Sequence, residues 1–293
     1  MAGILDADLV VVTGKGGVGK STVAAALALA AAHAGRRTVL AEVGGRNDTV
    51  RLLAGSGVDH VSITPREAME EYLRTQLPRT VAELLSRSGT FAAFVEATPG
   101  MNELLTIGKV WELAAERRRT PGADPYDLVV LDAPASGHGL ALLGAPRTFS
   151  EAARVGPIHR QAGIISATLG DPRATAVVAV TLPEEMPVNE TLELRAALRE
   201  RMGLDLSLVV ANGVVADRFG TAEAQVLGAL GAPVQSPVGA ALWAHGRARG
   251  QRGQLRRLRA GLDAPPVRLP FRYAAEIGPQ DAAAMAELLG ARL

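Results

Sequence analysis

The sequence predicts an α/β fold built on a mostly parallel, doubly wound sheet. The first observation is a β-branched run, Leu9–Thr13, which is followed by a glycine-rich loop and an alanine- and leucine-rich stretch to His33. The second is another apolar run, Thr38–Val43, which completes a strand, helix and strand with two parallel strands. The third is the recurrence of such runs further along the chain, at Leu128–Leu131, Ala176–Thr181, Leu206–Ala211 and Val267–Leu269.

Length and composition agree with one large globular unit. The chain has 293 residues, of which 48% are hydrophobic and 21% charged, and its net charge is +1. Such a chain can bury a large core, so wholesale disorder is excluded. The balanced charge makes nucleic acid an unlikely main partner. We therefore expect a single domain over residues 1–293.

A helical subdomain is predicted within this domain. About 80 residues separate the second and third strands, too many for a simple crossover. Helical patterns cover Glu67–Arg87, Phe91–Ala97 and Asn102–Arg119, and a further one, Ser150–Leu169, follows Pro146. We expect residues 65–120 and 146–170 to form the inserted subdomain.

The absence of cysteine excludes disulfides, thiolate metal sites and cysteine nucleophiles, and it fits a reducing cytoplasm. Asp6 and Asp8 stand where a secretory signal would carry basic residues. The apolar stretch Ser21–Gly35 is shorter than the roughly 20 residues that span a bilayer. We therefore expect a cytoplasmic protein without a transmembrane segment.

The glycine-rich loop matches G-x-x-x-x-G-K-[ST] between a predicted strand and a predicted helix, the context that a phosphate-binding P-loop requires. Its backbone N–H groups would surround a polyphosphate, Lys20 would reach the β- and γ-phosphates, and the Ser21 hydroxyl would bind Mg²⁺. Only three of the 31 basic residues are lysines, and two of them lie in this loop. The motif predicts a P-loop NTPase, with these nucleotide-binding residues: Gly14, Lys15, Gly16, Gly17, Val18, Gly19, Lys20, Ser21 and Thr22.

A second motif piece is the run Tyr126–Asp132, a buried strand that ends in a carboxylate. Phosphoryl-transfer sites in parallel sheets lie at the carboxyl ends of the strands. Asp132 is therefore the candidate to hold Mg²⁺ through water.

Lys15, the first residue inside the loop, resembles the signature lysine of the deviant Walker-A ATPases, which reaches the nucleotide of a partner subunit. Within that class, Leu131–Leu143 is similar to switch II of the arsenical-pump (ArsA) and tail-anchored-protein-targeting ATPases. Pro99–Glu103, Leu182–Glu185 and Asn189–Thr191 also resemble this family. The resemblance covers most of the chain, and it implies ATP hydrolysis by a dimer with Lys15, Lys20 and Asp132 as catalytic groups.

The chain departs from this family after its second strand. Family members carry an Asp there that positions the attacking water, and Gly44 stands in its place. Glu42 or Asp48 is a displaced substitute, and positioning tolerates little displacement. The missing cysteines also exclude metalloid binding by thiolates. The resemblance is to a bacterial single-half form, which implies a homodimer or a heterodimer with a paralogous ATPase.

The base-binding end is predicted from a later strand. Asn212 follows a strand, and the N-K-x-D pattern that reads guanine is absent. Adenine is therefore favoured. By family resemblance, the Asn212 amide would read the adenine edge, and Pro270 and Phe271 would flank the base.

Apolar residues of the helical segments allow two interpretations. They line a groove for an apolar helix, such as a membrane-protein client, or they pack the subdomain's own core. These residues are Phe91, Phe94, Val95, Phe149, Ile158, Ile164, Ile165 and Leu169.

Two functional alternatives stay open. One is a weakly hydrolysing or non-hydrolysing ATP-binding regulatory subunit of a hetero-oligomer. The other is a positioning ATPase similar to MinD or ParA, which rests on the basic run Arg247–Arg259.

Overall fold

The structure is a computed structural model that describes residues 3–44, 49–120, 122–153, 155–231, 233 and 235–292. The described residues form one seven-stranded sheet in the order β3-β2-β4-β1-β5-β6-β7, and every neighbouring pair is parallel. The predicted α/β class is confirmed. The strands are β1 (Leu9–Gly14), β2 (Thr38–Val43), β3 (Asp59–Ile63), β4 (Leu128–Asp132), β5 (Thr175–Thr181), β6 (Leu208–Val214) and β7 (Val267–Pro270).

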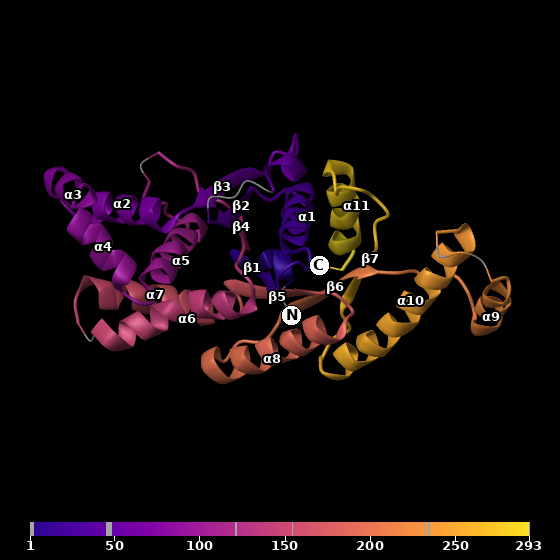
Figure 1. Ribbon diagram of the computed structural model, residues 1–293. Helices are drawn as coiled ribbons and strands as arrows, with labels where there is room; N and C mark the ends of the chain where they lie inside the picture. The colour runs from indigo at the N-terminus through magenta and orange to yellow at the C-terminus, as the bar shows by residue number, and fades with distance from the viewer. Residues whose placement is uncertain are drawn as a thin grey trace.

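Helices cover both faces of the sheet (Figure 1). One face packs against α1 (Lys20–His33) and α11 (Pro279–Gly290), with Val10 and Val12 pointing toward them. Leu9 and Val11 point to the opposite face, as the alternation of side chains along a strand requires. That face is covered by α5 (Met101–Ala114), α6 (Ser136–Ala153), α8 (Glu185–Met202) and α10 (Pro237–Ala260).

The end of α1 shows how local sequence sets an element boundary. Gly35 follows the helix with φ +82°, and the N–H of Arg36 donates to the carbonyl of Ala31 at 3.1 Å. A residue other than glycine adopts this left-handed conformation only at a cost. Gly35 therefore ends the helix as predicted, and the chain returns into β2.

Strand β3 was not predicted from the sequence. It lies at the edge of the sheet, and its register pairs Val39 with Asp59 and Val43 with Ile63. Only Ile63 is buried, because an edge strand has a single neighbour and half of its surface meets solvent. Its mixed polar sequence therefore lacks the continuous apolar signal of the central strands.

The predicted helix over Glu67–Arg87 is wrong in one respect, because two helices occupy it. They are α2 (Pro65–Gln76) and α3 (Arg79–Ser86), and the chain breaks at Leu77 and Pro78. Leu77 is extended, with φ −123° and ψ 153°, as the residue before a proline usually is.

The expectation of a helix beginning after Pro146 also needs correction. Pro146 lies inside α6, which continues to Ala153, and a second helix, α7 (Pro157–Gly170), follows. The proline removes one backbone hydrogen bond, but Leu142, Leu143 and Pro146 are buried. Packing of α6 against its neighbours thus outweighs the local preference against helix.

The remaining helices occupy the two ends of the molecule. α4 (Gly89–Ala97) lies with α2, α3 and α5 at the helical end, and α9 (Thr221–Ala229) lies beside α10 at the opposite end (Figure 1). Short 3₁₀ turns cover Ile4–Asp6 and Val50–Leu53. The inserted subdomain of residues 65–120 and 146–170 corresponds to α2–α5, the end of α6 and α7, and its status as a separate subdomain stays a prediction.

Several apolar residues of the helical end pack inward. Phe91 lies against a small core that includes Met69, Leu73 and Val95, and Ile165 and Leu169 are also buried. By contrast, Ile158 and Ile164 are 46% and 51% exposed. The side chain of Phe94 lies outside the described part. Most of the described residues in this set therefore serve the protein's own core.

Among the described helices, none combines the length and the apolar character needed to cross a bilayer.

Candidate nucleotide-binding site

Glycines of the P-loop are required by the close approach of neighbouring strands. Gly14 has φ +147°, and a Cβ atom there would lie 2.1 Å from the carbonyl oxygen of Val180 on β5. Gly19 has φ +91°, and its Cβ would lie 2.4 Å from Nδ2 of Asn212. Side chains at either position would clash or strain the backbone. The loop is thus shaped by β5 and β6 as well as by its own sequence.

Lys20 closes the loop. Its Nζ donates a hydrogen bond to the carbonyl of Lys15 at 3.0 Å, which spans the loop from the first turn of α1. The N-terminus of α1 adds the positive end of a helix dipole at the same place. Backbone amides, a helix terminus and an ammonium group therefore share one location.

Ser21 and Asp132 meet at the carboxyl edge of the sheet. The Ser21 hydroxyl donates to Oδ2 of Asp132 at 2.5 Å, although the two residues lie 111 positions apart. Asp132 ends β4 beside β1, and its residue is only 8% exposed. A hydroxyl and a carboxylate are oxygen ligands of the kind that Mg²⁺ prefers. The donor set therefore fits the predicted metal.

Lys15 forms an ion pair within the chain. Its Nζ contacts Oε1 of Glu190 on α8, and Oε2 of Glu190 accepts a hydrogen bond from Ser136 at 3.3 Å. Ser136 begins α6, within the segment that resembles switch II. Glu190 thereby joins the P-loop to this segment. Sequence reasoning found the Asn189–Thr191 motif but gave Glu190 no role.

Asn212 lies beside the P-loop. Its Nδ2 donates to the carbonyl of Val18 at 2.9 Å, and its Oδ1 accepts from the N–H of Gly213 at 2.9 Å. A carboxamide has a second N–H and a second lone pair, so these bonds leave capacity for a base. Asn212 as the reader of adenine stays a prediction.

Phe271 and Pro270 lie beside the end of β6, the strand that carries Asn212. Pro270 pairs with Val214 in the sheet, and the N–H of Phe271 donates to the carbonyl of Val214 at 2.9 Å. The Phe271 ring packs edge-on against Tyr273, with ring centroids 4.9 Å apart. Phe271 therefore lies beside the end of β6 that carries Asn212, and its role in flanking the base stays a prediction.

Two residues of α10 support this end, and the sequence did not identify them. Gln251 is buried, accepts from the N–H of Val215 at 2.8 Å and donates to the carbonyl of Gly213 at 3.0 Å. Arg247 pairs with Glu184 at 2.9 Å, and its guanidinium lies 5.9 Å from the centre of the Phe271 ring. The hydrogen bonds and the ion pair join residues more than 30 positions apart, so no local motif signals them.

Glu42 lies on β2 in register with Asp132. It is 2% exposed and accepts a hydrogen bond from Thr49 at 2.8 Å, while Nε2 of His60 lies 3.0 Å from the same oxygen. These contacts join β2 to Thr49 in the segment that follows it and to His60 on β3. Asp48, the other predicted substitute, lies outside the described residues.

Gly44 has φ +97°, and a Cβ atom there would point into open space. Its N–H donates to the carbonyl of Ile63 at 3.0 Å. The position therefore has room for a side chain but a backbone conformation that favours glycine.

Comparison with known protein families identifies the family of this chain. Residues 9–238 match the CobQ/CobB/MinD/ParA nucleotide binding domain. The chain belongs to this family. The matched region includes the P-loop, Asp132, Glu190 and Asn212, so the geometry above lies within a nucleotide-binding domain.

Curated relatives point to one branch. The chain is 34% identical over 221 residues to ATPase BagA of Mycobacterium tuberculosis, covering 69% of this chain and 63% of that protein. It is 30% identical over 201 residues to the arsenical pump-driving ATPase of Escherichia coli, covering 67% of this chain and 33% of that protein. The aligned part thus spans less than two thirds of either relative. These similarities support the ArsA-like assignment made from the motifs.

Proposed function

We propose that this chain binds Mg·ATP and hydrolyses it as a dimer that couples nucleotide state to an apolar client. The observation that carries the proposal is the convergence of the Lys20-closed P-loop with the Ser21–Asp132 pair at one sheet edge. The names of the two relatives, an ATPase and a pump-driving ATPase, agree with it. We also keep the cytoplasm, which supplies ATP, as the expected location.

The reaction class is phosphoryl transfer to water. The loop amides and Lys20 would hold the phosphates and stabilise the charge on the transferred group. Ser21 would bind Mg²⁺ directly and Asp132 through water, and the metal would supply positive charge that neutralises the phosphates. Asn212 would contact adenine, with Phe271 and Pro270 beside the base.

Water positioning is the weak step of this site. Gly44 offers no carboxylate, and Glu42 is already bonded to Thr49 and His60. We expect slow turnover in the isolated chain. This observation favours a second candidate function, an ATP-binding regulatory subunit whose paralogous partner supplies faster hydrolysis.

The dimer would form through Lys15. To reach a partner's phosphates, Lys15 must leave Glu190, which frees the contact between Glu190 and Ser136 to change as well. A client would meet the exposed apolar residues of the helical end, among them Ile158 and Ile164 on α7. Nucleotide state and client surface would thus be linked through α6, which runs from Ser136 to the helical end.

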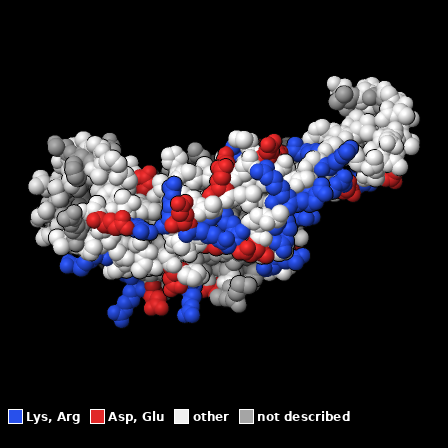
Figure 2. Space-filling model, turned by 90° about the horizontal axis from the view of Figure 1, so that it is seen from below, with Lys and Arg blue, Asp and Glu red and all other residues white. Residues whose placement is uncertain are grey.

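The MinD- or ParA-like alternative has less support from side chains. Basic residues gather along the side of the molecule that carries α10, with acidic residues among them (Figure 2). Arg247 pairs with Glu184 and Arg252 with Asp217. Part of the basic run is therefore neutralised within the chain.

The deciding test is calorimetry of ATP binding. We expect the wild type to bind Mg·ATP in preference to Mg·GTP, and Lys20→Ala to lose binding by about 100-fold or more, because an ammonium at the β- and γ-phosphates is removed. Lys15→Ala is the matched loop variant, which should keep measurable ATP binding but lose the ATP-dependent dimer. Equal affinity in the wild type and Lys20→Ala would refute the site.

A further inference from the structure

A cavity of about 120 Å³ lies at the helical end, between α2, α5 and α7. Its walls are largely apolar, and no P-loop residue lines it. The residues that form the apolar walls are Ala68, Leu104, Leu105, Ile158, Ala162 and Ile165. The nucleotide chemistry proposed above uses none of these residues, and Ile158 is shared with the surface proposed for the client.

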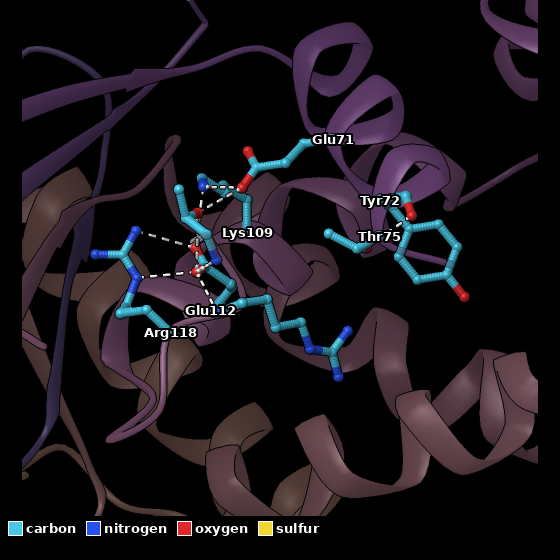
Figure 3. A network of polar contacts seen from close by, with 8 residues as sticks. Glu71, Tyr72, Thr75, Lys109, Glu112 and Arg118 are labelled. Atoms are coloured by element: carbon cyan, nitrogen blue, oxygen red, sulfur yellow. Dashed lines mark hydrogen bonds and ion pairs between the residues drawn. The ribbon is translucent and has the colours of Figure 1, made fainter. Parts of the chain in front are cut away.

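A network of charged side chains borders the cavity (Figure 3). Glu112 accepts hydrogen bonds from Lys109 at 2.9 Å and from Arg118 at 2.9 and 3.3 Å, and Lys109 also contacts Glu71 at 2.6 Å. Burial opposes ionisation of Glu112, but the bonds from Arg118 and Lys109 outweigh it and lower the pKa to about 2. These four groups therefore balance one another as two anions and two cations.

Arg119 adds a positive charge that this balance does not cover. It lines the cavity, and its guanidinium donates to Oε1 of Gln161 at 2.5 Å and lies 5.0 Å from the centre of the Trp111 ring. Both partners are neutral. Among the described residues, no carboxylate forms a salt bridge with Arg119, in contrast to Arg118 and Lys109 beside it.

We propose that this cavity binds a small apolar monocarboxylate, with the hydrocarbon inside and the carboxylate on Arg119. A guanidinium beside a low-polarity wall binds a carboxylate through two parallel N–H···O bonds. An amine would meet Arg119 as a like charge, and a neutral alcohol would leave the guanidinium without an anion. The ligand chemistry therefore follows from the excess charge and the apolar walls.

The volume limits the size of the hydrocarbon. A dry cavity of about 150 Å³ accommodates benzene, so 120 Å³ accepts about six carbon atoms or fewer. Each methylene that enters an apolar site raises affinity about fourfold. Affinity should therefore rise along a series of linear carboxylates and stop rising when the cavity is full.

The binding experiment uses the fluorescence of Trp111, which lies under Arg119. The chain has two tryptophans, so Trp243→Phe leaves Trp111 as the reporter. Acetate, butanoate, hexanoate and octanoate are titrated without nucleotide. We expect saturable binding that strengthens from acetate to hexanoate and gains less than fourfold from hexanoate to octanoate. Hexylamine and hexanol should bind at least tenfold more weakly than hexanoate.

Arg119→Gln tests the carboxylate contact. We expect it to weaken hexanoate binding at least tenfold and to leave hexanol binding unchanged within about twofold, because only the anion loses its partner. Arg117→Gln is the matched control, since Arg117 is exposed and two positions away. Because Arg119 also stacks on the reporter, calorimetry replaces fluorescence for this pair of variants.

Gly108 tests the cavity itself. It lines the space, and a Cβ there would make only an ordinary contact of 3.8 Å with Ile165. Gly108→Ala should weaken hexanoate binding several-fold without loss of folding, and Gly108→Leu should abolish it. Gly163→Ala on α7 is the control, because its Cβ would face Ser150 at 3.6 Å, outside the cavity. It should leave binding unchanged.

Any of three results would overturn the proposal. The first is the absence of saturable hexanoate binding at 20 mM or below, which is about twenty times a dissociation constant of 1 mM. The second is hexylamine binding as tightly as hexanoate. The third is hexanoate binding that neither Arg119→Gln nor Gly108→Ala weakens. Each can occur while ATP binding is intact, so failure here is distinct from failure of the proposed ATPase function.

Discussion

The nucleotide end and the helical end of this molecule use the same kinds of side chain in opposite ways. At the nucleotide end, Lys20 donates to the backbone carbonyl of Lys15, and Lys15 pairs with a partly exposed Glu190. At the helical end, the third lysine, Lys109, is fixed between two carboxylates. Charges at the first end can move onto a ligand, whereas those at the second end hold helices together.

This contrast separates binding from stability. Glu112 is 6% exposed and receives charged donors from two side chains, so removing it leaves buried cations behind. Lys15 and Glu190 are 31% and 30% exposed, and solvent screens their attraction. Substitutions in the Glu112 network should thus act mainly on folding, and substitutions at the nucleotide end mainly on ligand and partner.

The largest effect is expected for Glu112→Ala. Breaking a buried ion pair by removing one partner costs about 3–5 kcal/mol, because Arg118 and Lys109 lose their shared anion. Urea unfolding measures the loss, with the exposed Glu116→Ala as the control. ATP affinity of the folded variant should change by less than about twofold, since the site is distant. A loss below about 1 kcal/mol would contradict the structural role of the network.

Acid should reproduce part of this effect in the wild type. The folded pKa of Glu112 is about 2, below its ordinary value of 4.5, so the unfolded chain binds the proton more tightly. The stabilisation is therefore complete above pH 4.5 and is lost as the pH falls toward 2, by about 3 kcal/mol in all. Urea midpoints between pH 6 and 3 measure it. The slope should be smaller in Glu112→Gln, and an identical slope would exclude Glu112 as its source.

How far the sequence predicted each end depends on how its residues are connected. Gly14–Thr22 is one contiguous loop whose backbone makes the site, and Asp132 ends an apolar strand, so both could be recognised from local patterns. The partner of Lys15 lies 175 positions away, and nothing near Lys15 identifies Glu190. The cavity draws on α2, α5, α7 and Arg119, which only packing brings together. Lys109 falls within the predicted helix Asn102–Arg119, but nothing in the sequence identifies its two carboxylate partners.

Backbone conformation was equally hidden. The sequence showed Gly44 in place of a family Asp, but not that its φ is +97°. Likewise, the sequence did not predict strand β3. This strand carries His60, whose Nε2 lies within hydrogen-bond distance of the Glu42 carboxylate. Predictions about catalysis therefore depended on two features that only the fold supplies.

A moderate effect is expected at Gly44. A left-handed backbone raises the conformational energy of Asp and of Asn by a similar amount, about 1–2 kcal/mol, so the two variants form a matched pair. Only Asp can hold the attacking water, and we expect Gly44→Asp to hydrolyse ATP at least tenfold faster than Gly44→Asn. Steady-state phosphate release measures the difference, and ATP affinities of the two variants should agree.

The same assay distinguishes the roles of Gly44, which follows β2, and Glu42, which lies within it. Equal rates for Gly44→Asp and Gly44→Asn would show that a carboxylate at this position is not the missing group. Brisk wild-type turnover that collapses in Glu42→Ala would show that Glu42 has taken over water positioning, against the regulatory-subunit reading.

The smallest effect is expected at Glu190, and it tests whether the Lys15 contact competes with the proposed dimer. The pair is partly exposed, so it stabilises the free monomer by about 1 kcal/mol or less. Glu190→Gln removes that competition, and the ATP-dependent dimer should tighten by up to about fivefold for each Lys15 that crosses to the partner. Sedimentation with a non-hydrolysable ATP analogue measures this, and Glu193→Gln, exposed on the same helix, is the control. In a Lys15→Ala background the gain should vanish, because no ammonium is left to release. A weaker dimer in Glu190→Gln would instead place Glu190 itself among the groups that bind the partner.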